Sequence, residues 1–363
     1  MVATRAISDG SQHCTGMFHA PSASFTYVRT SAMAYYLGID GGGTKTRCVL
    51  ADETAVLAQV MTGGCSVIRL GEKQARESLH GAIRQVCTTA KISPERIAAV
   101  CIGATGVARP EIAETIRKIV GEMIPATAGA NSAPKIEVVA DTVIALEAAF
   151  SAGPGVIVIA GTGSIAYGRD LAGHTARAGG WGFAISDEGS GYWIGRCAIS
   201  AILRAYDQGD STKQDQDRET SLTALVLRAS KLRSVDELVA PANATPPPEF
   251  ARLFPIVLRA ADEGDPIARE ILDDAGNKLA GLAATVVRRL AMHASPNSAA
   301  GKRPLDETAA EKLSVAMTGS VFRQSASVRE VFHRELREIF PGIEVHQNLA
   351  DPVDGALARA RRM

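Results

Sequence analysis

The sequence predicts an α/β fold made of two related segments, and three observations lead to this prediction. A strand, a tight glycine turn and a second strand occur at Tyr35–Ala51 and recur at Gly155–Arg169, a spacing of roughly 120 residues that indicates a duplicated domain rather than a short repeat. Buried strands then alternate with amphipathic helices, as in a mixed sheet flanked by helices. The chain of 363 residues is also long enough for two domains.

The first segment, residues 35–150, starts with antiparallel strands and continues with alternating strands and helices. After the opening unit we expect strands at 55–61, 97–103 and 136–140, and helices at 72–89, 110–120 and 145–150. Apolar residues recur at helical spacing in 72–89. Pro110 suits the first turn of a helix.

The second segment, residues 151–351, is expected to hold a sheet and a large helical part. We expect strands at 155–160, 165–169, 174–178, 313–317 and 343–346, a long helix from about Ser190 to Tyr206 and further helices to His293, with loops at 207–219, 241–248 and 294–306. A last helix covers Pro352–Arg361. Asp351 and Asp354 open it and are expected to cap it and to favour its dipole.

Residues 1–34 differ in composition from the rest and are left out of the predicted fold. They are rich in Ser, Thr, Ala and His, hold one acidic residue, Asp9, and have only Arg5 and Arg29 as basic residues. This is a weak pattern for a transit peptide. We expect a disordered extension or a chain start at Met33.

The overall charge and the cysteines exclude several classes of function. Basic and acidic residues balance at 39 each, so no net charge draws the protein to nucleic acid or to an anionic membrane, and no apolar run is long enough to span a bilayer. Six cysteines stand at positions 14, 48, 65, 87, 101 and 197 without a C-x-x-C pair. This spacing predicts a reducing cytoplasm and argues against a disulfide framework, structural zinc or an iron–sulfur cluster.

Asp40 and the glycine turn after it are the most informative feature of the first segment. The run Gly41-Gly42-Gly43-Thr44-Lys45-Thr46 joins two strands with backbone that carries almost no side chains at its tip. Such a turn lets amide N–H groups approach a phosphate closely. The threonine hydroxyls can donate to phosphate oxygens, and Asp40 can hold a hydrated Mg²⁺. The alternative is an ordinary glycine hairpin.

A second turn, Gly161-Thr162-Gly163-Ser164, ends the apolar strand that opens the second segment. Its shape suits the outer phosphates of a nucleotide. Alone it is equally compatible with a plain hairpin. Because the two turns stand in register with the duplication, we interpret both as phosphate-binding.

Asp141 is the candidate general base. It follows a strand at its carboxyl end, where α/β sheets open their clefts, and it precedes a helix. Capping of that helix is the alternative role, and one residue can do both. Phosphoryl transfer needs amide donors, a metal-holding carboxylate and a base near the acceptor hydroxyl, and these residues together supply all three.

The segment Gly179–Ser190 predicts a ligand-binding loop. Glycines stand beside Trp181 and two acids, Asp187 and Glu188, a composition that suits neither core nor regular structure. It fits a loop around a polar, ring-shaped ligand such as a sugar, with a carboxylate accepting from hydroxyls and Ser190 capping the next helix. The alternative places Trp181 in the core and uses the acids as caps. Further along, Gly319-Ser320 ends a strand and offers bare backbone to a nucleoside.

These motifs, in this order, resemble the N-acetylglucosamine kinase group of the BadF/BadG/BcrA/BcrD ATPase family, within the actin/hexokinase/Hsp70 fold. The resemblance covers roughly residues 35–360 and rests on Gly38–Thr46, Ala160–Ser164, Gly179–Ser190 and Thr318–Val321. It implies two ribonuclease-H-like domains, 35–150 and 151–351, with an interdomain cleft for ATP, Mg²⁺ and a sugar. It also implies that the last helix, 352–363, joins the first domain.

The resemblance assigns roles to individual residues. It makes Asp141 the catalytic base and Asp40 the metal-side carboxylate in transfer of the γ-phosphate to the 6-hydroxyl of an amino sugar. It matches Thr44 and Thr162 to phosphate contacts, Gly319 and Ser320 to the adenosine motif, and Gly180, Trp181 and Asp187 to sugar-contacting positions. Together with the glycine turns, the predicted nucleotide-binding residues are Gly42, Gly43, Thr44, Lys45, Thr46, Gly161, Thr162, Gly163, Ser164, Gly319 and Ser320, and the predicted sugar-binding residues are Ser66, Asp141, Gly180, Trp181 and Asp187.

One departure leaves the sugar open. Relatives that phosphorylate N-acetylglucosamine often carry an Asn beside Ser or Thr after the third strand, whereas this chain has Val67 after Ser66. Glucosamine, N-acetylglucosamine, N-acetylmuramic acid or another hexosamine therefore remain candidates. The oligomeric state is open too, and a homodimer is one expectation.

Two other classes of function compete with the kinase. An ATPase activator of a 2-hydroxyacyl-CoA dehydratase or benzoyl-CoA reductase would hold an iron–sulfur cluster through paired cysteines, which the sequence does not offer. A non-catalytic sugar-binding regulator would carry a DNA-binding segment before the fold, and residues 1–34 are short and weakly basic for that.

Overall fold

The computed structural model describes residues 34–125, 133–208, 220–245, 248–293 and 312–363. The chain from Ala34 onward forms one compact unit. The expectations for residues 1–33, for the loop at 294–306 and for most of 207–219 fall outside the described residues.

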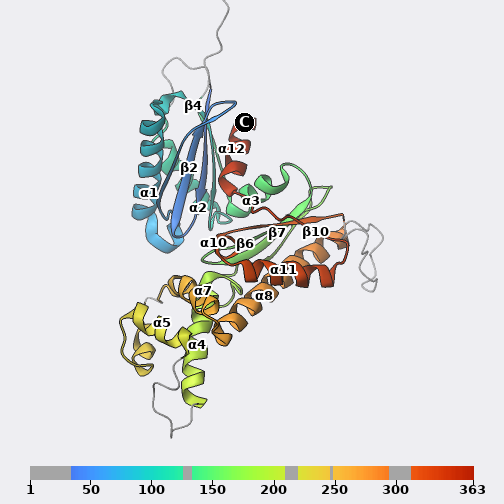
Figure 1. Ribbon diagram of the computed structural model, residues 1–363. Helices are drawn as coiled ribbons and strands as arrows, with labels where there is room; N and C mark the ends of the chain where they lie inside the picture. Colours follow the sequence, from blue (N-terminus) through green and yellow to red (C-terminus); the bar gives the residue numbers. More distant parts are fainter. Residues whose placement is uncertain (1–33, 126–132, 209–219, 246–247, 294–311) are drawn as a thin grey trace, which may run out of the picture. The chain divides into compact units, whose positions relative to one another are not determined.

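A mixed five-stranded sheet forms the first part of this unit (Figure 1). Its strands are β1 (Tyr35–Gly41), β2 (Lys45–Ala51), β3 (Val56–Gly63), β4 (Ile97–Ala104) and β5 (Lys135–Ala140), in the order β3-β2-β1-β4-β5. The first three strands pair antiparallel, whereas β1, β4 and β5 run parallel. The register aligns Gly41 with Ala104 and Ala104 with Ala140, so the carboxyl ends of the parallel strands meet at one edge.

Helices cover both faces of the first sheet, as Figure 1 shows. One face carries α1 (Val67–Ala90) and α2 (Pro110–Gly121), and the other carries α3 (Asp141–Phe150) and the C-terminal α12 (Pro352–Arg362). The short η1 (Pro94–Arg96) connects α1 to β4. Glycines permit the close approach of α12. A Cβ at Gly38 would lie 2.7 Å from the Leu357 nitrogen, and one at Gly355 would overlap the Ile144 carbonyl oxygen.

The second sheet repeats the arrangement of the first. Its strands are β6 (Gly155–Ala160), β7 (Ser164–Arg169), β8 (Thr175–Gly179), β9 (Ser314–Thr318) and β10 (Glu344–Val345), in the order β10-β9-β6-β7-β8. An antiparallel meander of three strands is again extended by parallel neighbours. Ala145 and Leu146 of α3 pack against Ile157 and Ala316 of this sheet, so α3 contacts both sheets.

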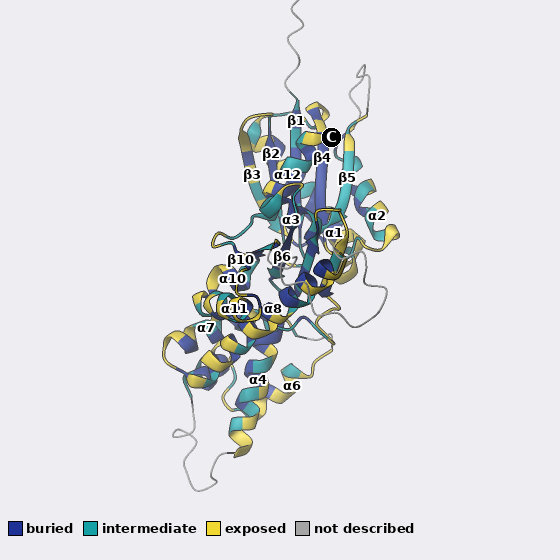
Figure 2. Ribbon diagram, turned by 90° about the vertical axis from the view of Figure 1, so that its right-hand side faces the viewer, coloured by how far each residue is buried: buried dark blue, intermediate teal, exposed yellow. Residues whose placement is uncertain are grey.

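The second sheet has a large helical partner. Its helices are α4 (Gly191–Gln208), α5 (Ser221–Ser230), η3 (Asp236–Leu238), α6 (Val239–Ala242), η4 (Phe250–Leu253), α7 (Phe254–Asp262), α8 (Pro266–His293), α10 (Ser320–Gln324) and α11 (Ala326–Ile339). The alanine-rich α8 lies at the centre of this core and is buried along much of its length, as the dark blue in Figure 2 indicates. Small side chains let helices and strands approach it closely.

The structure differs from the sequence-based expectations mainly at element ends. α1 begins at Val67 instead of Glu72, with Ser66 as its N-cap and an irregular Gly71 (φ 80°) inside. α3 begins at Asp141 itself rather than at Ala145. Residues 239–242, partly in an expected loop, form α6. Among the described residues, no helix is long and apolar enough to cross a membrane.

Candidate active site

Three polar residues gather where β1, β4 and β5 end. Asp40 is the second-to-last residue of β1, Thr105 follows β4, and Asp141 follows β5. The Thr105 backbone N–H donates to the Gly41 carbonyl (3.3 Å), and the Thr105 hydroxyl donates to Asp141 Oδ2 (2.9 Å). The carboxyl edge of a parallel sheet is where α/β proteins place ligands. The register of the strands thus brings both predicted carboxylates to one site.

Asp141 is held in one orientation by two hydrogen bonds. Its Oδ2 accepts from Thr105, and its Oδ1 accepts from the backbone N–H of Thr142 (2.9 Å). Burial raises the pKa of Asp141, and these donors only partly oppose the rise. Asp141 is the first residue of α3 and Ala140 stands at the N-cap without a side-chain capping bond, so Asp141 does not play the capping role expected as an alternative. Its contact with the helix backbone is the bond from the Thr142 N–H.

Asp40 is surrounded by charges of both signs. Burial, followed by Asp141 and Asp351, raises the pKa of Asp40 to about 6, while Arg47 and Lys45 lower it. A carboxyl group with this pKa is partly protonated near neutrality. A divalent cation would favour its ionised form, because a positive charge offsets the neighbouring carboxylates.

Asp351 does not act as the helix cap that the sequence led us to expect. It stands at the N-cap position of α12, but its side chain makes no capping hydrogen bond. Both of its carboxylate oxygens instead accept from Arg47 Nη1, at 2.6 and 2.7 Å. The charge of Arg47 on β2 outcompetes the neutral backbone donors of the helix. This pair joins the first sheet to the start of the last helix.

The first glycine turn contacts the residues that immediately precede α1. The Cys65 backbone N–H donates to the Gly42 carbonyl (3.1 Å), and there is no room for a Cβ at Gly64 against the Gly43 backbone. Thr44 is exposed at the tip, whereas Thr46 is fully buried beside the Cys65 thiol. Of the two threonines, therefore, only Thr44 presents its hydroxyl to solvent.

The second glycine turn is joined to the loop that follows β8. The Gly191 backbone N–H donates to the Gly161 carbonyl (2.8 Å), and the Ser164 hydroxyl donates to the Glu188 carbonyl (2.7 Å). A Cβ at Gly163 would lie 2.7 Å from Asp187 Oδ2. Asp187 accepts from the backbone N–H groups of Gly182 and Ser164, while burial raises its pKa. Asp187 thus lies against the turn itself.

Asp187 and the glycines of the same loop adopt the left-handed backbone conformation. Asp187 has a φ of 64°, and Gly180 and Gly182 have φ values of 68° and 100°. Strain of this kind in a non-glycine residue gathers at functional sites. Trp181 is 65% exposed. The Arg177 guanidinium lies over its ring, with the guanidinium carbon 4.0 Å from the centre of the Trp181 ring. Trp181 is therefore exposed, and the alternative that placed it in the core is wrong. Ser190 caps α4 as expected, because its hydroxyl accepts from the Trp193 N–H (3.2 Å).

Gly319 and Ser320 complete the group on the second sheet. A Cβ at Gly319 would overlap the Ala160 carbonyl, and its φ of 108° also requires glycine. A Cβ added at Gly161 would lie 4.0 Å from the Ser320 hydroxyl oxygen. The two strand ends β6 and β9 therefore place the Gly161–Ser164 turn and the Gly319-Ser320 pair side by side.

The structure thus arranges the site residues expected from the sequence in two groups, one per sheet. It adds Arg47 and Thr105, which the sequence analysis missed, and gives Asp351 a charge partner in place of the expected cap. Arg69, whose Nη1 is 3.4 Å from the position of a Cβ on Gly43, and its ion-pair partner Glu249 (2.6 Å) were missed as well. Thr105 carried a usable signal, since it follows a buried strand in a Gly-Ala-Thr-Gly run. The ion pairs carried none, because their members lie far apart in sequence.

Comparisons with known proteins agree with this arrangement. A family model described as the BadF/BadG/BcrA/BcrD ATPase family matches residues 37–358. An N-acetylmuramic acid/N-acetylglucosamine kinase of Clostridium acetobutylicum is 31% identical over 332 residues, which is 91% of this chain and 99% of the relative. An N-acetyl-D-glucosamine kinase of Dictyostelium discoideum is 28% identical over 333 residues, 88% of this chain and 96% of the relative.

A solved structure gives the same result for the fold. A Chromobacterium violaceum protein, provisionally named an N-acetylglucosamine kinase, superposes with a TM-score of 0.64 at 26% identity and covers 90% of this chain and 98% of its own. The α/β fold expected from the sequence is confirmed by the two five-stranded sheets and by this likeness. Because the family model spans nearly all of the described chain, this protein belongs to the BadF/BadG/BcrA/BcrD ATPase family.

Proposed function

We propose that this protein is an ATP-dependent kinase that phosphorylates an amino sugar at its 6-hydroxyl, with Asp141 as the general base. The observation that carries the proposal is the hydrogen-bonded Asp141 at the carboxyl edge of the first sheet, beside Asp40 and the glycine turn. Both relatives described above are named as kinases of N-acetylglucosamine, and one also as a kinase of N-acetylmuramic acid.

Asp141 would take the proton of the attacking hydroxyl. Its raised pKa makes the Asp141 carboxylate a stronger proton acceptor. The hydrogen bond from the Thr105 hydroxyl fixes the position of Oδ2, while Oδ1 faces the backbone of α3. Thr142 N–H stabilises the ionised form before the reaction. Positioning of this kind supplies much of the rate of phosphoryl transfer, because the transition state needs little covalent help.

The two glycine turns would bind the phosphates. Their amides can approach an anion without hindrance from side chains, Lys45 adds a positive charge, and Thr44 and Thr162 add hydroxyl donors. Gly319 and Ser320, beside the second turn, would face the nucleoside. On the acceptor side, Ser66, Gly180, Trp181 and Asp187 would line the sugar.

The acidic residues at this edge fit a magnesium ion. Mg²⁺ is usually held by one or two carboxylates together with substrate phosphates, so a single protein carboxylate, Asp40, suffices. Bound there, the ion would neutralise charge on the transferred phosphoryl group.

The test is release of ADP in a coupled assay with glucosamine, N-acetylglucosamine, N-acetylmannosamine, N-acetylmuramic acid and glucose as acceptors. We expect turnover with at least one amino sugar and weak turnover with glucose. Asp141→Asn should lower kcat by about 10²–10⁴-fold, the usual loss for a positioned base, while nucleotide binding survives. Near-normal turnover of that variant would show that another group is the base.

The readouts also separate the competing functions. Tight sugar binding without ADP release under any condition would favour a non-catalytic sugar-binding protein. Stoichiometric iron in an anaerobic preparation would favour an ATPase activator. The dependence of turnover on Mg²⁺ concentration, compared between the wild type and Asp40→Asn, tests the metal assignment.

A further inference from the structure

A charged groove runs along α11, on the opposite side of the helix from its core contacts. Val328, Phe332 and Leu336 pack into the core of the second sheet, and Val331 is also buried. The groove has a volume of about 700 Å³, within the range of small-molecule sites. Its lining residues are Ala326, Arg329, Glu330, His333, Arg334, Arg337, Glu338 and Gln347. None belongs to the candidate active site.

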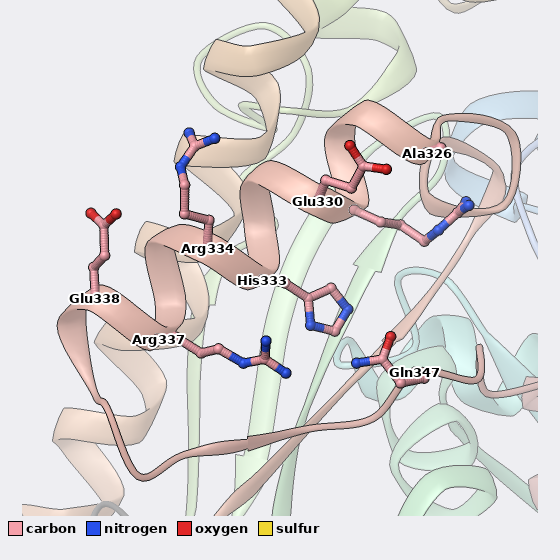
Figure 3. A pocket seen from close by; sticks show the side chains of 8 residues that line it. Ala326, Glu330, His333, Arg334, Arg337, Glu338 and Gln347 are labelled. Carbon is pink, nitrogen blue, oxygen red and sulfur yellow. The ribbon is translucent and has the colours of Figure 1, made fainter.

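A positive stripe forms the inner wall of this groove. Arg329, His333 and Arg337 recur every four residues and so lie one above another on the helix. Figure 3 shows His333 and Arg337 directed toward Gln347, while Arg334 and Glu338 project away from Gln347. The carboxylate of Glu330, three residues before His333, also lines the groove. Gln347 comes from the segment after β10 and brings an amide to the same space.

Two groups in this stripe, one on His333 and one on Arg337, have no partner among the described residues. Nδ1 of His333 is buried and has no hydrogen-bond partner among the described residues. Within the same residues, Arg337 has no ion pair or hydrogen bond, whereas Arg334 pairs with Glu335 (3.0 Å). Arg329 donates to the Phe322 carbonyl. Burial, then Arg337 and Arg329, lower the pKa of His333.

This combination is unusual for a helix face that only meets solvent. Arg329 and Arg337 oppose protonation of the His333 between them, and a buried polar atom without a partner carries a further cost. An anion in the groove would remove both costs at once. The guanidinium group can grip a phosphate through two parallel hydrogen bonds, and a carboxamide and an imidazole can add one each.

We propose that the α11 groove binds a phosphate monoester or inorganic phosphate, held by Arg337, His333 and Gln347 beside the fixed charge of Arg329. A sugar phosphate would fit the volume, and its assignment as a ligand rests on the proposed kinase function. Binding of inorganic phosphate does not depend on that function. The site is separate from the two glycine turns, so it can be tested without catalysis.

The first measurement follows His333 by NMR in the full-length protein, with His333→Gln to assign its signal. Two titrations are compared at equal ionic strength, one in chloride and one in inorganic phosphate. The bound anion should raise the pKa of His333 by about 1, because an opposite charge within a few ångströms favours the imidazolium. The same pKa in both salts would overturn the proposal.

The second measurement compares two arginines of the same helix. Arg337→Gln should weaken the phosphate effect on His333 by about tenfold, the loss expected for one charge-assisted hydrogen bond. Arg334 also lines the groove, but its side chain points away from Gln347 and is already paired with Glu335, so Arg334→Gln removes the same charge and should leave the affinity within about twofold of wild type. Equal losses in the two variants would show a general charge effect and not a site.

Repeating the titration with glucosamine 6-phosphate identifies the source of the phosphate. Tighter binding of the ester than of inorganic phosphate, lost in Arg337→Gln, would assign the groove to a sugar phosphate. Equal affinities would assign it to the phosphate group alone. Because His333 reports locally, binding of either compound at the candidate active site does not affect this readout, and a failure of the kinase assay leaves it unchanged.

Discussion

Arg69 and Glu249, separated by 180 residues in the chain, form an ion pair in which Arg69 Nη2 lies 2.6 Å from Glu249 Oε1. Arg69 stands in the first turn of α1, and its Nη1 is 3.4 Å from the position a Cβ would take on Gly43. Glu249 precedes η4 and is also paired with Arg252 (2.5 Å). A positive charge at the first glycine turn is therefore held by a carboxylate of the second half.

Arg69 should contribute to nucleotide binding. Its guanidinium lies next to the turn and offsets the charge of Glu249. Arg69→Gln removes this positive charge from the turn and leaves Arg252 as the ion-pair partner of Glu249. We expect ATP to bind about tenfold more weakly, as measured by titration calorimetry with a non-hydrolysable analogue. Arg252→Gln removes the other partner of Glu249, away from Gly43, and serves as the matched control. Similar affinities in the two variants would contradict this role.

Asp141→Asn should stabilise the protein at neutral pH although it lowers kcat by about 10²–10⁴-fold. The pKa of Asp141 is raised on folding, so its ionised form is disfavoured in the native state and costs stability as the pH rises above its ordinary value of 3.8. The amide removes this cost, and we expect a gain of about 0.5–2 kcal/mol in the free energy of unfolding at pH 7. Denaturant titrations at several pH values measure it.

The sign of the pH dependence makes this prediction specific. Below the unfolded pKa, Asp141 is protonated in both the folded and the unfolded state, and the gain of the variant should disappear. A variant that is less stable than wild type at pH 7 would mean that the hydrogen bonds from Thr105 and Thr142 outweigh the desolvation of the carboxylate.

Glu137 and Arg359 should fix α12 to the first sheet in a pH-dependent manner. Arg359 Nε donates to Glu137 Oε2 (3.0 Å), and the hydrogen bond from Arg359 is the main cause of a lowered pKa for Glu137. Because the pKa of Glu137 is lower in the folded than in the unfolded state, the ionised Glu137 stabilises the protein at pH values above its unfolded pKa of 4.5. This stabilisation is lost as the pH falls through the folded-state pKa. Glu137→Gln should cost about 1 kcal/mol at pH 7.

In acid, that cost should vanish, because wild type and variant then carry the same charge. Glu111→Gln, on the exposed start of α2, is the control and should change stability by less than about 0.5 kcal/mol at any pH. A loss for Glu137→Gln that persists in acid would point to packing in place of charge.

Gly355→Ala should be strongly destabilising although alanine favours helices. A Cβ at this position would overlap the Ile144 carbonyl, so α12 must move away from α3. We expect a loss of about 2–4 kcal/mol in thermal or denaturant unfolding. Gly281→Ala in α8, where nothing lies within 4 Å, should instead gain about 0.5–1 kcal/mol. Equal effects at the two glycines would show that the close contact is not structurally important.

Much of the fold could be predicted from the sequence because its signals are local. Alternating apolar strands and glycine turns located β1, β2, β6 and β7 to within a few residues, since a turn needs specific backbone conformations. Helix starts were less predictable. α1 begins five residues before its expected start, because the irregular Gly71 interrupts the helical pattern after the Ser66 cap. α3 begins four residues before its expected start, because no side-chain cap marks its first turn.

The sequence by itself determined the duplicated glycine turns, the strand-end aspartates and hence the family, because each is a short run whose chemistry is complete locally. Only the tertiary structure decided what those residues meet. It joined Thr105 to Asp141, turned Asp351 from a helix cap into the partner of Arg47, and placed Asp187 against the second turn. These relationships follow from strand register and long-range packing, which the order of residues along the chain does not encode locally.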